Sequence, residues 1–242
     1  MTKRLDQLLV ERGLFDSRAK ARAAIEAGRV RVDGQVARKA SQEVSFAASI
    51  DAEPAHPWVG RGALKLDHAL TLWPVAVEGR TALDVGASTG GFTEVLLSRG
   101  AARVYAVDVG RGQLHPRVAA DPRVVNLEGV DARTLDPTLI PEPPQLVVCD
   151  ASFIGLAKVL PAALALAAPE AELIALVKPQ FEAGPGHVGK GGLVRDPDVH
   201  ARVLAEVAAW LEASGWPVLA TADSPVEGGD GNHEFLLRAR RA

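Results

Sequence analysis

Four ionisable side chains stand where the ends of predicted strands would bring them together. Asp150 and Lys178 each follow an apolar run, Glu234 opens the last apolar run, and Lys65 lies near the start of a helical segment. The carboxyl ends of parallel strands meet at one sheet edge, and an antiparallel last strand would begin at that edge. Each residue alone could be an ordinary strand-end charge, but together they favour a site that moves a proton. A lysine serves as a base only if its pKa falls from about 10.4 toward neutrality, which a second ammonium and partial burial promote.

A glycine-rich turn follows the first apolar run after residue 80. Its glycines let the backbone turn tightly and approach a ligand closely. Asp108 ends the next run and could accept hydrogen bonds from ribose hydroxyls, whereas Asp131 follows the third run and could accept one from an adenine amino group. The residues expected to bind a cofactor are Asp84, Gly86, Ser88, Thr89, Gly90, Gly91, Phe92, Asp108 and Asp131.

The spacing of these glycines favours one cofactor over another. A dinucleotide fingerprint has the pattern G-x-G-x-x-G, whereas Gly86, Gly90 and Gly91 follow G-x-x-x-G-G. An acid such as Asp84 would repel a pyrophosphate but would neutralise the ammonium and sulfonium of S-adenosyl-L-methionine. We therefore expect S-adenosyl-L-methionine, with a dinucleotide or a turn without any ligand as the alternatives.

Two other patterns in the sequence give little information about function. The segment 184–190 resembles the start of a phosphate-binding loop, but Gly191 replaces the Ser or Thr that would bind Mg²⁺. We interpret residues 182–195 as a mobile loop near the site. The six histidines show no metal-ligand spacing, so we expect no metal.

The elements that carry these residues alternate between strand and helix. Several strands are continuous apolar runs, as expected when helices cover both faces of a parallel sheet. This predicts a doubly wound, Rossmann-like α/β domain. The expected strands are 82–85, 104–107, 124–127, 146–149, 173–177, 217–220 and 235–237, and helices are expected at 93–98 and 199–214.

The first 42 residues differ in charge from the rest of the chain. They hold ten Lys and Arg against five Asp and Glu, a net charge of +5, although the whole chain has a net charge of −3. A short helix is expected over 4–12, and a second helix should begin after the N-cap Ser17 and end at Gly28. Asp33-Gly34 predicts a tight hairpin. A basic segment on an acidic body favours a polyanionic partner, although a solvated surface is an equal alternative.

These N-terminal motifs resemble a known RNA-binding domain. The patterns R-L-D-x-L-L-x-x-R-G-L and S-R-x-x-A-x-x-x-I-x-x-G-x-V-x-V-D-G run from Arg4 to Gly34. They are similar to the small α+β domain named after ribosomal protein S four. The resemblance implies that Arg4, Arg18, Arg22 and Lys39 contact RNA.

The order Lys65, Asp150, Lys178, Glu234 resembles the tetrad of RNA ribose 2′-O-methyltransferases of the FtsJ type. The resemblance implies a class I methyltransferase sheet of seven strands with the last strand antiparallel. It also implies that Lys178 is the general base for a ribose hydroxyl. Lys65 would then tune Lys178 and orient the ribose, while the two carboxylates would hold the amines in place.

Further motifs resemble the TlyA family, in which an S-four-type domain precedes an FtsJ-like domain. They are V-G-R-G-A-L-K-L, A-S-T-G-G-F, K-P-Q-F-E, G-K-G-G and G-N-H-E. This resemblance implies 2′-O-methylation of cytidine in ribosomal RNA, with ribosomal RNA or ribosomal subunits as partners. A hemolysin-like protein and a non-catalytic RNA-binding protein are the alternatives.

The chain should therefore contain two domains. We expect an RNA-binding domain over residues 1–55, a proline-containing linker over 56–60 and a methyltransferase domain over 61–242, with Arg133 as a further RNA contact. The single cysteine, Cys149, lies in an apolar run and fits a reducing compartment. Neither a signal peptide nor a membrane span is evident, so we expect a cytoplasmic protein.

Overall fold

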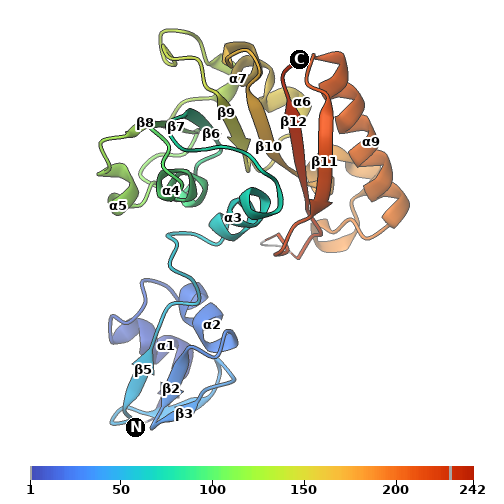
Figure 1. The fold of residues 1–242 in the computed structure, drawn as a ribbon. Helices are drawn as coiled ribbons and strands as arrows, with labels where there is room; N and C mark the ends of the chain where they lie inside the picture. The colour runs from blue at the N-terminus through green and yellow to red at the C-terminus, as the bar shows by residue number, and fades with distance from the viewer. Residues whose placement is uncertain (1, 229–230) are drawn as a thin grey trace. The chain divides into compact units, whose positions relative to one another are not determined.

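The chain folds into two compact units, each with a hydrophobic core of its own. A computed structural model describes residues 2–228 and 231–242. The N-terminal unit comprises residues 1–57 and the C-terminal unit residues 58–242 (Figure 1). The boundary between them lies within the segment 56–60 that the prolines mark in the sequence.

The N-terminal unit packs two helices against short strands. The serine cap is confirmed, because the Ser17 hydroxyl accepts a hydrogen bond from the backbone N–H of Lys20. The hairpin is confirmed too, because Asp33 and Gly34 have φ angles of 49° and 79° and join two antiparallel strands. The elements are β1 (Thr2–Arg4), α1 (Leu5–Glu11), α2 (Arg18–Glu26), β2 (Val30–Val32), β3 (Gln35–Val36), β4 (Glu43–Ser45) and β5 (Ile50–Ala52).

The C-terminal unit is built on a seven-stranded sheet in the order β11-β12-β10-β9-β6-β7-β8. The strands from β10 to β8 are parallel, and β12 is antiparallel to both of its neighbours, which confirms the predicted arrangement. Every predicted strand is present. Their bounds are β6 (Thr81–Val85), β7 (Arg103–Asp108), β8 (Val124–Glu128), β9 (Leu146–Cys149), β10 (Glu172–Val177), β11 (Val218–Asp223) and β12 (Phe235–Arg240).

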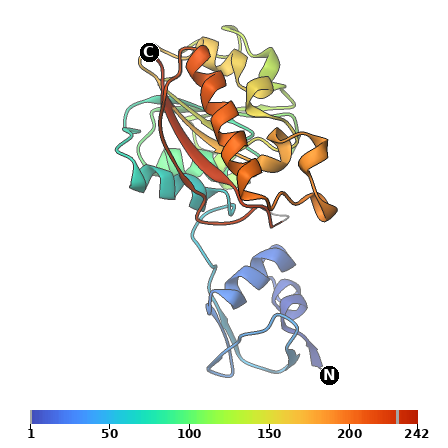
Figure 2. The same ribbon diagram turned by 90° about the vertical axis from the view of Figure 1, so that its right-hand side faces the viewer.

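Helices cover both faces of this sheet. Successive strand residues alternate between two cores, so that Ala82 packs with α3 and α4 while Leu83 packs with α6, α7 and α9. Figure 2 shows α9 crossing one face of the sheet. The helices are α3 (Ala63–Leu72), α4 (Gly91–Ser98), α5 (Pro116–Ala119), α6 (Leu156–Val159), α7 (Pro161–Leu166), α8 (Pro179–Glu182) and α9 (Pro197–Ala213).

The turn between β6 and α4 depends on glycine for reasons of packing. Gly86 and Gly90 have φ angles of 83° and 91°, which side chains disfavour. A Cβ on Gly86 would lie 2.9 Å from the Cα of Ala151, and a Cβ on Gly91 would lie 3.0 Å from the backbone nitrogen of Ala63. These glycines therefore let the turn pack closely against the segment after β9 and against α3.

Candidate active site

The four residues of the predicted tetrad, Lys65, Asp150, Lys178 and Glu234, line one cavity of about 550 Å³. Lys65 lies in the first turn of α3, Asp150 and Lys178 directly follow β9 and β10, and Glu234 directly precedes β12. The antiparallel direction of β12 is what brings Glu234 to the edge where the parallel strands end. The topology therefore assembles in space the residues that the sequence separates.

The tetrad forms three ion pairs, two of which share the carboxylate of Asp150. Lys65 Nζ donates to Glu234 Oε2 at 2.5 Å, and Lys178 Nζ lies 2.8 Å from Asp150 Oδ1. Lys65 Nζ also lies 3.7 Å from the same Asp150 oxygen. Both lysine side chains are only 7% exposed, so each ammonium needs a carboxylate partner. The two lysines and two carboxylates balance in charge and hold one another in place.

Lys178 has further partners that the sequence analysis missed. Its ammonium also donates to the backbone carbonyl of Asp150 at 3.1 Å and to the Ser152 hydroxyl at 2.9 Å. Nearby, Glu182 accepts from the backbone N–H of Leu156 at 2.7 Å, and burial raises the pKa of the Glu182 carboxyl. The segment 150–156 is thus held by contacts to residues at the start and end of the segment 178–182. The feature of the sequence that could have indicated Ser152 is its position two residues after Asp150.

Six residues of the glycine-rich turn also line the tetrad cavity: Gly86, Ala87, Ser88, Thr89, Gly91 and Phe92. Gly86 and Ser88 also line an adjoining cavity of about 570 Å³, together with Asp108 and Asp131. Asp108 is held by two backbone N–H groups, those of Ser88 at 2.8 Å and Gly110 at 2.7 Å. Each carboxylate oxygen can accept more than one hydrogen bond, so Asp108 retains capacity for a ligand hydroxyl.

Two residues of the predicted cofactor set, Asp84 and Gly90, line neither of these cavities. Asp84 is fully buried and accepts a hydrogen bond from the Thr93 hydroxyl at 2.7 Å. Its Oδ1 atom has no hydrogen-bond partner among the described residues. Burial raises the pKa of Asp84 to about 7. A Cβ on Gly90 would meet Leu114 and Val118, so this glycine allows helix α4 to pack.

Asp131 and Arg133, predicted to bind adenine and RNA, pair with each other. The Arg133 guanidinium lies 2.5 Å from Asp131 Oδ2 and also donates to it through Nε at 3.0 Å. This hydrogen bonding lowers the pKa of Asp131 to about 2. The Arg133 side chain is 59% exposed, so the pair lies at the rim of the adjoining cavity.

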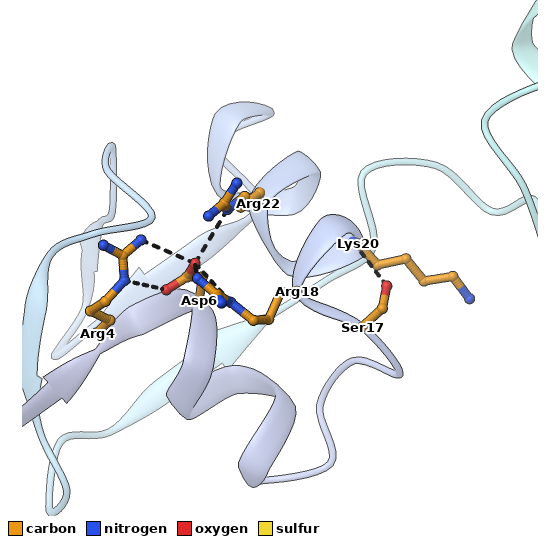
Figure 3. Close-up of polar contacts among 6 residues, drawn as sticks. All are labelled: Arg4, Asp6, Ser17, Arg18, Lys20 and Arg22. Carbon is orange, nitrogen blue, oxygen red and sulfur yellow. Dashed lines mark hydrogen bonds and ion pairs between the residues drawn. The ribbon is translucent and has the colours of Figure 1, made fainter. Parts of the chain in front are cut away.

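Three of the predicted RNA contacts in the N-terminal unit converge on a residue that the sequence analysis did not single out. Asp6 is fully buried, and Figure 3 shows Arg4, Arg18 and Arg22 directed toward its carboxylate. The shortest nitrogen–oxygen distances are 3.1, 2.8 and 3.2 Å, respectively. Each arginine side chain is still 36–49% exposed. We name these four residues the arginine cluster.

The cluster has a net positive charge that faces solvent. Three guanidinium groups share one carboxylate, and the hydrogen bond from Arg4 is the largest cause that lowers the pKa of Asp6 below its usual range. Lys39 lies exposed outside this cluster, between β3 and β4. A fixed group of guanidinium donors suits the recognition of phosphate oxygens.

Among residues 2–228 and 231–242, no group of three or more His, Cys, Asp and Glu side chains could hold a metal ion. Within the same residues, no helix has the length and apolar character needed to cross a bilayer.

Comparison with known proteins identifies both units. The model of the FtsJ-like methyltransferase family matches residues 58–241, and that of the S4 domain matches residues 3–50. The chain is 49% identical to the 16S/23S rRNA (cytidine-2′-O)-methyltransferase TlyA of Mycobacterium tuberculosis, over 98% of this chain and 89% of that protein. It is 35% identical to Hemolysin A of Brachyspira hyodysenteriae, over 96% of this chain and 98% of that protein.

A solved structure shares the whole fold. It is that of a protein described as a hemolysin from Streptococcus thermophilus, with a TM-score of 0.79, 37% identity and coverage of 100% of this chain and 89% of that one. The tetrad geometry, the two cavities and these matches agree on one enzyme class. This chain belongs to the FtsJ-like methyltransferase family, to its TlyA members, and carries an S4 domain at its N-terminal end.

Proposed function

We propose that this protein transfers a methyl group from S-adenosyl-L-methionine to the ribose 2′-hydroxyl of a cytidine in ribosomal RNA. The observation that carries the proposal is the tetrad, whose two lysines and two carboxylates line one cavity beside the glycine-rich turn, with Lys65, Lys178 and Glu234 buried. The choice of cytidine and of ribosomal RNA is supported by the names of the relatives.

The cofactor would lie across the glycine-rich turn and the adjoining cavity. Asp108 would accept from its ribose hydroxyls and Asp131 from its adenine amino group, while Gly86, Ser88 and Thr89 would contact it with backbone atoms. The acidic lining suits a cationic ligand. When bound, S-adenosyl-L-methionine supplies a methyl group on a positively charged sulfur, which is an activated leaving group.

The tetrad would supply the base for the attacking hydroxyl. A ribose hydroxyl is a weak acid, and it must lose its proton as it attacks. Lys178 in its neutral form would take that proton, since it lies at the cavity surface beside Asp150. Lys65 would orient the ribose, and Glu234 would hold Lys65 in place. Correct positioning of the reacting groups would supply much of the rate enhancement.

The N-terminal unit would hold the RNA. Arg4, Arg18 and Arg22 of the arginine cluster would contact phosphates, with Lys39 beside β3 and Arg133 in the C-terminal unit as further contacts. Because the substrate would be ribosomal RNA or a ribosomal subunit, the protein would act in the cytoplasm, where ribosomes are.

The test is methyl transfer to ribosomal subunits with labelled S-adenosyl-L-methionine, followed by nucleoside analysis. The methyl should reside on a cytidine ribose, where it makes the neighbouring linkage resistant to alkali. Lys178→Ala should lower the rate by about 10²–10⁴-fold, because the general base is lost. Lys178→Arg should fail as well, because a guanidinium remains protonated.

Binding measurements provide the control for these variants. Both should still bind S-adenosyl-L-methionine in calorimetry and RNA in a filter assay, since neither change alters the glycine-rich turn or the arginine cluster. A methyl found on a base, or an active Lys178→Arg protein, would contradict the proposal.

A further inference from the structure

Asp6 places a negative charge inside the arginine cluster, where a negatively charged partner would bind. Its side chain is fully buried and accepts hydrogen bonds from Arg4, Arg18 and Arg22. The carboxylate cancels one of the three positive charges that the cluster offers to phosphates. Attraction alone would therefore favour a neutral residue at this position. The geometry of the cluster shows a second effect, which opposes this loss of charge.

The three arginines meet at one oxygen atom of Asp6. Arg4 Nη2, Arg18 Nη2 and Arg22 Nε lie 3.2, 2.8 and 3.2 Å from Oδ2 (Figure 3). Nitrogens this close to one oxygen lie within twice that distance of one another, so the three positive charges would repel one another without the carboxylate. Arg4 belongs to β1 and the other two arginines to α2. Asp6 therefore gathers side chains from two separate elements.

Many of the guanidinium N–H groups point elsewhere than at Asp6. A guanidinium has five such donors. Arg4 and Arg18 each direct two of them at Asp6, and Arg22 directs one. Each arginine side chain is 36–49% exposed, so its other donors can reach a phosphate in solution. The carboxylate thus fixes the arginines from behind and leaves donors for a ligand in front.

Fixing long side chains before binding favours a partner of fixed shape. Ordering one such side chain at an interface lowers affinity by about 2- to 12-fold. A folded RNA presents its phosphates at fixed positions, so a preformed set of donors avoids this cost. A flexible single strand can adapt its phosphates to mobile arginines, so its binding depends mainly on the number of charges. The carboxylate therefore favours folded RNA over flexible RNA, while it weakens the attraction to both.

We propose that Asp6 is a positioning residue that makes the N-terminal unit selective for folded RNA: it fixes three arginines for phosphates of fixed geometry and weakens attraction to flexible polyanions. The inference rests on the proposed function, in which Arg4, Arg18 and Arg22 contact the RNA substrate. It deepens that function, because it assigns discrimination between RNA shapes to a fully buried residue.

Asp6→Asn in the full-length protein separates arrangement from charge. Two probes are compared at the same salt concentration: intact ribosomal subunits, whose RNA is folded, and unstructured poly(U). Affinity for subunits should fall by about fivefold or more, because the guanidinium groups must become ordered on binding. Affinity for poly(U) should stay the same or rise, because a negative charge beside the phosphates is lost. The ratio of the two affinities is a readout that a purely structural role would not move.

Glu11→Gln is the matched control for the change in charge. Glu11 lies on α1, the helix that carries Asp6, but it is exposed and pairs with Lys3 outside the arginine cluster. Both affinities should stay the same or rise in this variant, and their ratio should change by less than about twofold. Amides of α1 and α2 that still exchange more slowly than in the urea-unfolded protein show that each variant remains folded.

A second variant keeps every charge and changes only the donors. In the double variant Arg4→Lys, Arg18→Lys, Asp6 retains cationic partners, but a lysine lacks the rigid fork of donors that a guanidinium has. Affinity for subunits should again fall by about fivefold or more, and affinity for poly(U) should change by less than about twofold. This variant tests the inference even if Asp6→Asn fails to fold.

The outcomes separate this inference from the proposed function. Equal losses for both probes would make Asp6 a residue for folding alone, and equal gains would make it a simple opposing charge. Either result, or an unchanged ratio in the double lysine variant, overturns the inference and leaves the proposed methyl transfer intact. If the wild type shows no preference for subunits over poly(U), the RNA-binding part of the proposed function fails and Asp6 has no RNA to select.

Discussion

Asp84 occupies a position in which its negative charge is poorly tolerated. It is fully buried, one of its oxygens accepts from Thr93, and burial raises its pKa to about 7. In the unfolded chain the same carboxyl has an ordinary pKa of 3.8. Between these two values the unfolded chain releases a proton that the folded protein retains. The contribution of Asp84 to the free energy of unfolding is therefore fully present below about pH 4. It is lost as the pH rises through about 7.

Asp84→Asn should remove this pH dependence in the ligand-free protein. From pH 5 to pH 8, the free energy of unfolding should decrease more in the wild type than in the variant, by about 3 kcal/mol. Urea unfolding of both proteins at the two pH values measures the difference, and titrating groups that do not interact with Asp84 cancel in the comparison. Equal pH dependence in the two proteins would show that Asp84 is already ionised in the native state.

Residue types and their order predicted much of the site, but not all of it. Lys65, Asp150, Lys178 and Glu234 could be found because strand ends are visible in the sequence, and a parallel sheet brings strand ends together. Asp6 could not be found in the same way, and the place of Ser152 just after a strand end did not reveal that its hydroxyl contacts Lys178. Their contacts depend on rotamers and on distances across the fold, which hydrophobic periodicity does not encode.

At the scale of the element, helices α1 and α2 are linked by one carboxylate, that of Asp6. Asp6 lies in the first turn of α1, while Arg18 and Arg22 lie one turn apart on α2. Because arginine contacts lower the pKa of Asp6, its stabilising effect is present above the ordinary pKa of 3.8. That effect is lost as the pH falls through the lower, native value.

Asp6→Asn should destabilise the N-terminal unit even at neutral pH. Three guanidinium groups would lose their shared counter-charge, and residue 6 would lose hydrogen bonds that the negative charge strengthens. Hydrogen exchange of the amides of α1 and α2 at pH 7 should therefore accelerate by about tenfold or more. Amides of α9 in the C-terminal unit serve as the internal control and should be unaffected. Unchanged exchange in α1 would mean that the arginines stack on the surface without holding the helices.

The elements themselves were predicted unevenly. The seven strands of the large sheet were all predicted, because each contains apolar residues in sequence and the parallel strands β6, β7, β9 and β10 are almost continuous buried apolar runs. The strands β1, β4 and β5 were not, because each has three residues and only one of the nine is buried. Such strands form because tertiary contacts align them, and local propensity contributes little.

At the scale of the whole molecule, charge and chemistry are divided between the two units. The N-terminal unit carries the arginine cluster, and the C-terminal unit carries the tetrad and both cavities. Deleting residues 1–57 should leave a folded C-terminal unit, because that unit has its own core. The domain order could be predicted from the sequence, because the S4-like and FtsJ-like motifs occupy separate segments.

The deletion should weaken RNA binding and also reduce its dependence on salt. Each lost phosphate contact should lower the slope of log affinity against log salt by about 0.7 to 0.9. Loss of Arg4, Arg18, Arg22 and Lys39 should thus reduce the slope by about 3. Filter binding of ribosomal RNA at several salt concentrations measures it, with calorimetry of S-adenosyl-L-methionine as the folding control. An unchanged slope would place the phosphate contacts elsewhere.

The chain passes from one compact unit to the other only once, near Pro57. RNA held by the first unit would therefore be presented to the second by a covalent tether, which typically corresponds to an effective concentration in the millimolar range. The tether would make capture of RNA efficient without changing the chemistry that follows. Adding a separate N-terminal unit at micromolar concentration to the isolated C-terminal unit should not restore RNA capture. A large excess of RNA should restore it.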